Sequence, residues 1–124
     1  MAARKILVVD DEPEVRKLME HFLTDRGYEV RLAANGREGL VAIDSFVPDV
    51  VLLDMHMPEM DGVETLKQLA SRAPGLPVIM VTVNEDVQTT SQLLQLGASD
   101  YVPKPFNLDY LEQAINIQLS AVRG

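Results

Sequence analysis

Four ionisable side chains follow segments that have the composition of short strands. Asp10 and Asp11 come directly after one apolar run, Asp54 follows a second, and Lys104 follows Asp100–Pro103. If these segments are parallel strands, the four groups meet at the carboxyl edge of one sheet, where open α/β folds bind their ligands. Three carboxylates at one point repel one another unless a divalent cation is bound. A hard cation, a carboxylate and an ammonium group together provide the groups that are needed to receive a phosphoryl group.

Composition limits the classes of protein to consider. A chain of 124 residues with 47% hydrophobic and 24% charged residues is one folded domain with a core of its own. The net charge of −8 and the lack of a Lys/Arg stripe argue against direct binding of nucleic acid. Without cysteine there is no disulfide or thiolate metal site. The first apolar run is too short for a signal peptide or a membrane span, so we expect a cytoplasmic protein.

Strand and helix patterns alternate five times along the chain. Unbroken apolar runs indicate parallel strands covered on both faces, and charges at alternate positions indicate an edge strand. Apolar residues at helical spacing follow each strand. This alternation predicts a doubly wound α/β domain. The predicted strands are Lys5–Val9, Glu29–Ala33, Val50–Leu53, Val78–Val81 and Asp100–Pro103, and the helices begin near Pro13, Asn35, Val63, Val87 and Leu108.

The chain closely resembles the receiver domain of two-component response regulators. Four segments carry the resemblance in the right order and spacing: Ile6–Pro13, Leu53–Gly62, Val78–Thr82 and Gly97–Phe106. The resemblance implies a flavodoxin-like (βα)5 fold whose five-stranded parallel sheet has the order 2-1-3-4-5. Residues 1–124 would then be a single receiver domain, either a stand-alone protein or the N-terminal part of a longer regulator.

Asp54 is the candidate phosphoacceptor, because a carboxylate can attack phosphorus and form an aspartyl phosphate. The ordinary alternative for a lone aspartate after a strand is a helix N-cap. Asp10 and Asp11 would hold Mg²⁺, with Mn²⁺ as the alternative ion, since such ions prefer oxygen ligands. The resemblance implies direct ligation by Asp11, Asp54 and the backbone carbonyl of His56, with Asp10 acting mainly through water. Acidic residues at this position also stabilise the N-terminus of the first helix through its dipole, and this role is compatible with metal binding.

Three further residues each have an ordinary structural interpretation and a functional one. Lys104 is either a solvated lysine or the cation that binds a phosphoryl oxygen after transfer. Thr82 suits a strand by its branching, and the resemblance implies that its hydroxyl donates to the phosphoryl group. Tyr101 is either ordinary core packing or a switch residue that rotates when Thr82 moves. The resemblance also implies a cis bond before Pro105.

The chain departs from the family pattern after the hydroxyl donor, where Val83 stands in place of the usual Ala or Gly. That position borders the opening through which phosphodonor and water reach the aspartate in receivers. A rotamer-restricted valine should narrow this opening. His56 and Asn84 also flank it, and we treat the three residues as a candidate access gate.

The resemblance implies a phosphoacceptor switch rather than a turnover enzyme. A histidine kinase or histidine phosphotransfer protein would phosphorylate Asp54, and the domain would catalyse its own phosphorylation and dephosphorylation. The fourth helix, fifth strand and fifth helix would then face a downstream effector domain or protein. Three alternatives stay open: a phosphohydrolase with an aspartyl intermediate, which needs a cap; a nucleotide or flavin module, which needs a glycine-rich first loop; and a receiver-like binding module that is never phosphorylated.

Overall fold

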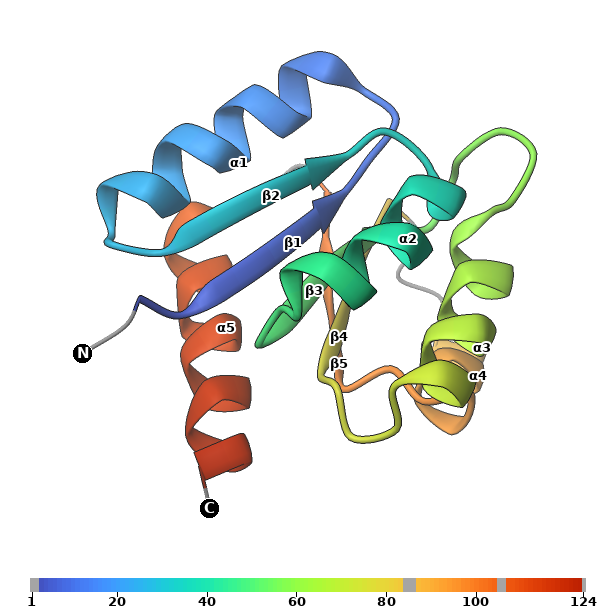
Figure 1. The fold of residues 1–124 in the computed structure, drawn as a ribbon. Helices are drawn as coiled ribbons and strands as arrows, with labels where there is room; N and C mark the ends of the chain where they lie inside the picture. The colour runs from blue at the N-terminus through green and yellow to red at the C-terminus, as the bar shows by residue number, and fades with distance from the viewer. Residues whose placement is uncertain (1–2, 84–86, 105–106, 124) are drawn as a thin grey trace.

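The computed structural model describes residues 3–83, 87–104 and 107–123, without the side chains of residues 87 and 121–123. Within these ranges strands and helices alternate as the sequence predicts (Figure 1). The strands are β1 (Lys5–Val9), β2 (Glu29–Ala33), β3 (Val50–Asp54), β4 (Val78–Thr82) and β5 (Asp100–Pro103). The helices are α1 (Pro13–Asp25), α2 (Gly36–Phe46), α3 (Gly62–Arg72), α4 (Val87–Gln95) and α5 (Leu108–Arg123).

The strands form one parallel sheet in the order β2-β1-β3-β4-β5, which confirms the predicted fold class and the edge position of β2. Two strands extend one residue beyond their predicted ends, so that Asp54 and Thr82 are ladder residues. Asp54 lies opposite Val81, and Thr82 lies opposite Pro103. Because all strands run the same way, their carboxyl ends share one edge of the sheet, and the polar residues at these ends are fixed by backbone pairing.

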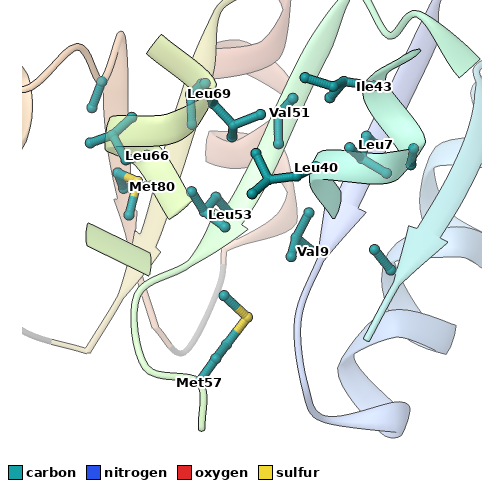
Figure 2. Packing of buried hydrophobic residues seen from close by; sticks show 14 of the residues in the cluster. Leu7, Val9, Leu40, Ile43, Val51, Leu53, Met57, Leu66, Leu69 and Met80 are labelled. Atoms are coloured by element: carbon teal, nitrogen blue, oxygen red, sulfur yellow. The ribbon is translucent and has the colours of Figure 1, made fainter. Parts of the chain in front are cut away.

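The core consists of two apolar clusters, one on each face of the sheet. On β1, Leu7 and Val9 pack with α2 and α3, whereas Ile6 and Val8 pack with α1 and α5. Figure 2 shows side chains of the first cluster. Both faces of β1, β3 and β4 are buried, so the interior positions of these strands are apolar, which explains why their sequences are unbroken apolar runs.

Helices α2 and α3 begin at polar caps that hold them against the sheet. The side chains of Asn35 and Asp61 accept the amide hydrogens of Glu38 and Glu64, each at 2.9 Å. Asp61 therefore caps α3, and Asp54 does not have the capping role that we considered for it. Gly62 brings the start of α3 onto the end of β3, because a Cβ there would lie 2.5 Å from the carbonyl oxygen of Asp54.

Candidate functional site

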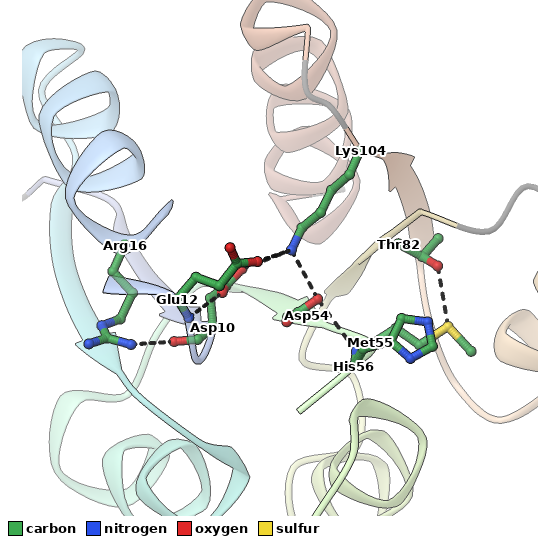
Figure 3. A network of polar contacts seen from close by, with 8 residues as sticks. All are labelled: Asp10, Glu12, Arg16, Asp54, Met55, His56, Thr82 and Lys104. Carbon is green, nitrogen blue, oxygen red and sulfur yellow. Dashed lines mark hydrogen bonds and ion pairs between the residues drawn. The ribbon is translucent and has the colours of Figure 1, made fainter. Parts of the chain in front are cut away.

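Asp54 ends β3 with a buried carboxylate at the carboxyl edge of the sheet. Its side chain is 4% exposed. Oδ1 accepts a hydrogen bond from Lys104 Nζ at 3.2 Å and a longer one from the His56 amide at 3.5 Å (Figure 3). The carboxylate is thus oriented by the turn that follows it and by the cation that follows β5, whereas Asp61 caps the next helix.

Lys104 connects carboxylates from the ends of β1 and β3. Its ammonium lies 3.3 Å from Asp10 Oδ2, 3.2 Å from Asp54 Oδ1 and 3.6 Å from Glu12 Oε1. Its backbone amide donates to Thr82 O at 2.8 Å, which continues the pairing of β4 with β5 and aims the side chain at the acids. The sheet therefore brings together residues that are 50 and 94 positions apart in the sequence.

Burial raises the pKa of both Asp10 and Asp54, and this desolvation outweighs the hydrogen bonds and the Lys104 charge that favour their ionised forms. The charge of Asp10 raises the pKa of Asp54 further. For Lys104, burial alone would lower the pKa, but attraction to Asp10 and Asp54 raises it above its ordinary value of 10.5. Desolvation is a larger cause of the raised pKa values of both acids than repulsion by neighbouring carboxylates. A cation bound at the site therefore stabilises the ionised forms of these buried carboxylates.

Asp10, Asp11 and Glu12 form a cluster whose carboxylate oxygens lie within 4.8 Å of one another. Asp10 is buried, while Glu12 is at the surface. Asp10 Oδ1 accepts the Glu12 amide at 2.9 Å, so the loop after β1 is folded back onto its own aspartate. A set of hard oxygen donors open to solvent on one side suits Mg²⁺, which keeps several of its waters. The residues present therefore fit the predicted metal.

Two residues that contact the site were not singled out from the sequence. Arg16, in α1, donates from Nη1 to the backbone carbonyl of Asp10 at 2.7 Å. The other is Glu12, whose carboxylate is within ion-pair distance of Lys104. A side chain on the first turn of a helix can fold back over the loop before it, but the rotamer that makes this contact is not determined by the sequence spacing.

The predicted switch residues lie beside the site. Thr82 is buried, and its hydroxyl donates to Met55 Sδ at 3.4 Å (Figure 3). Tyr101 is half-buried and packs against the α2/α3 side of the core, as does Met55. The contact of Met55 with Thr82 was not predicted from the sequence.

Of the three predicted gate residues, Val83 is 63% exposed and His56 is also exposed. Asn84, the third, and Pro105, the predicted cis-proline, lie outside the described residues.

The family model of the response regulator receiver domain matches residues 6–116. The chain belongs to this family. It is therefore a receiver with a phosphoacceptor signalling role in two-component signal transduction. The match confirms the family predicted from the sequence.

Named relatives and solved structures agree with this assignment. The receiver is 41% identical to regulatory protein AtoC of Escherichia coli over 98% of the chain and 27% of AtoC, and 45% identical to response regulator MprA of Mycolicibacterium vanbaalenii over 86% of the chain and 46% of MprA. It thus spans less than half the length of these relatives. A CheY-like receiver from Methanospirillum hungatei superposes with a TM-score of 0.93 at 32% identity, covering 98% of both chains. The receiver domain of Brucella abortus NtrX gives 0.87 at 34% identity, covering 93% of this chain and 98% of that one.

Within the part of the receiver that the structure describes, no helix has the length and apolarity needed to cross a membrane.

Proposed function

We propose that this receiver accepts a phosphoryl group on Asp54 from a histidine kinase or histidine phosphotransfer protein. The observation that carries the proposal is the ammonium of Lys104 held 3.2–3.3 Å from the carboxylates of Asp54 and Asp10, beside an acidic cluster. A buried carboxylate next to a cation, at the exposed edge of a sheet, is equipped for attack on phosphorus and for holding the charge that arrives.

In the proposed transfer, a carboxylate oxygen of Asp54 forms a bond to phosphorus as the P–N bond of the donor phosphohistidine breaks, and the imidazole leaves with the electron pair. Asp11, Asp54 and the carbonyl of His56 would hold Mg²⁺ directly, with Asp10 acting through water; Mn²⁺ is the alternative ion. Such an ion would neutralise charge on the phosphoryl oxygens. Most of the catalysis is positioning, since the donor supplies the high-energy bond.

After transfer, Lys104 is proposed to move from its two carboxylates to a phosphoryl oxygen, and Thr82 to donate its hydroxyl to another. Hydrolysis then needs only a water molecule in line with the P–O bond, which restores the carboxylate and releases phosphate. The receiver would therefore catalyse both its phosphorylation and its dephosphorylation, without turning over a separate substrate as an enzyme does.

We propose that Tyr101 follows Thr82 and alters the surface formed by α4, β5 and α5, to which an effector domain or protein binds. The site would work in the cytoplasm, where ATP-dependent kinases act. Residues 1–124 would form one receiver domain that acts alone or as part of a longer regulator, and the greater length of the curated relatives supports the second arrangement.

Intact mass after incubation with acetyl phosphate and Mg²⁺ tests the proposal. The parent protein should gain one phosphoryl group, and Asp54→Asn, which keeps size and fold, should gain none. Stoichiometric labelling of Asp54→Asn would place the acceptor elsewhere. Catalytic release of phosphate from a general phosphomonoester would favour a phosphohydrolase, and no labelling of the folded parent would favour a receiver-like binding module.

A further inference from the structure

The contact between Thr82 Oγ1 and Met55 Sδ, at 3.4 Å, joins the residue after the candidate phosphoacceptor to the candidate switch residue (Figure 3). A thioether sulfur is a weak hydrogen-bond acceptor on a flexible side chain. The contact therefore stabilises one orientation of the hydroxyl, by less than a bond to an oxygen acceptor would.

The backbones on both sides of this contact are fixed. The Met55 amide donates to Val81 O at 3.0 Å, and the Met55 carbonyl accepts from the Gly62 amide at 2.8 Å. The carbonyl of Thr82 accepts from the Lys104 amide at 2.8 Å. Because these pairings hold β3, β4 and β5 in register, the hydroxyl can leave the sulfur only by rotation of a side chain.

Met55 packs on the face of the sheet that also carries Thr82 and Tyr101. Tyr101 lies opposite Met80 in the ladder, and Thr82 is two residues beyond Met80, so all three side chains are on the same face of the sheet. Met55 and Tyr101 both pack against the core cluster that contains Met80. The thioether is therefore in contact with the hydroxyl donor and shares a packing surface with the aromatic switch.

We propose that Met55 is a positioning residue: its thioether stabilises the resting orientation of the Thr82 hydroxyl and so contributes to the free-energy difference between the resting and phosphorylated states. The proposal rests on the function proposed above for Thr82. Rotation to a phosphoryl oxygen on Asp54 exchanges a bond to sulfur for a charge-assisted bond, which is stronger. A weak acceptor holds the resting state without opposing this exchange.

Met55→Leu removes the acceptor and keeps a side chain of similar volume. Met57→Leu is the matched control, because Met57 lies in the same loop and is buried in the same core cluster. Met55→Gln places an amide oxygen, a stronger acceptor, on a side chain of similar length. Thermal melts of the three variants establish that each is folded.

The affinity for beryllofluoride with Mg²⁺, which mimics the phosphoryl group, reads out the switch. Loss of a weak hydrogen bond should make Met55→Leu bind about two- to fivefold more tightly than the parent. Met57→Leu should bind like the parent, and Met55→Gln more weakly. Scalar couplings that report the Thr82 side-chain rotamer in the free protein should shift in the Met55 variants and not in Met57→Leu.

Equal or weaker binding by Met55→Leu with an unchanged Thr82 rotamer would overturn the proposal, and would assign Met55 to packing alone. Failure of the parent to bind beryllofluoride at all would overturn the proposed phosphoacceptor function instead, and the rotamer couplings would then still show whether the sulfur holds the hydroxyl. The two failures are therefore distinguishable.

Discussion

Lys104 Nζ and Asp54 Oδ1 are 3.2 Å apart, although Asp54 ends β3 and Lys104 follows β5, 50 residues later in the sequence. The same ammonium is 3.3 Å from Asp10 Oδ2. In the metal-free domain this lysine supplies the positive charge that the two buried carboxylates require, and a bound metal or phosphoryl group would change that balance.

The acidic cluster leads to a prediction about metal binding. Because an ion that binds only the folded state stabilises it by linkage, Mg²⁺ should raise the melting temperature of the parent. Asp11→Ala should abolish most of this rise. Glu14→Ala, which removes one negative charge from the first turn of α1 outside the cluster, should keep it. Differential scanning calorimetry with and without Mg²⁺ measures both. A full Mg²⁺ response in Asp11→Ala would show that the ion binds elsewhere.

The raised pKa values predict how the stability of the metal-free domain depends on pH. Asp10 and Asp54 bind protons more tightly in the folded state than in the unfolded chain, whose value is about 3.8. The stability that this contributes is present below that value and is lost as pH rises through the raised values. Asp54→Asn should therefore lose less stability than the parent as the pH rises from about 4 toward neutrality, because the pKa of Asp54 in the folded state is raised above about 3.8.

Urea unfolding in the presence of a chelator gives this pH profile. Asp44→Asn removes the same charge from the exposed face of α2 and controls for the change in net charge. If Asp54→Asn and the parent have parallel profiles, the Asp54 carboxylate is not the source of the pH dependence.

Val83 leads to a prediction about the lifetime of the phosphorylated state. Its side chain is 63% exposed directly after Thr82, at the edge of the sheet where Asp54 lies. If it narrows the approach of water, Val83→Ala and Val83→Gly should hydrolyse phospho-Asp54 several-fold faster, since about 1.4 kcal/mol of barrier corresponds to a factor of ten. Labelling by small phosphodonors should also be faster. A decay time course in which neither variant exceeds the parent would exclude steric gating by Val83.

Val47 leads to a prediction about stability. It follows α2 with φ of 53°, in the left-handed region, where a β-branched side chain is strained. Its side chain is 65% exposed, so little packing would be lost. Val47→Gly should stabilise the domain by about 1 kcal/mol and raise the melting temperature by roughly 3–5 °C.

Val41→Gly is the matched control for this prediction, because Val41 is 71% exposed within α2, where glycine is a poor helix former. That variant should be less stable by roughly 0.3–0.5 kcal/mol. A loss of stability in Val47→Gly would mean that the exposed valine contributes packing that outweighs its backbone strain.

Much of the fold was predictable because β1, β3 and β4 are covered on both faces, which leaves an unbroken apolar pattern in each strand. The convergence of Asp10, Asp54 and Lys104 follows from the parallel arrangement, since each of them follows or ends a strand. The exact ends of β3 and β4 were not predictable, because a polar residue at a strand end looks like the start of a loop until its ladder partner is known. The contacts of Met55 and Arg16 depend on side-chain rotamers, which sequence spacing does not determine.

The order in which the parts of the site occur along the chain has a consequence for biosynthesis. Asp10 is near the beginning, while Lys104 is 94 residues later and reaches it through the last strand of the sheet. A ribosome makes the chain from the N-terminus, so the acidic half of the site exists well before its counter-charge. Contacts between such distant residues also form late in folding, because closing a long loop is entropically costly. A nascent or truncated chain without β5 therefore carries the candidate acceptor Asp54 without the cation beside it, and the proposed function would require completion of the sheet.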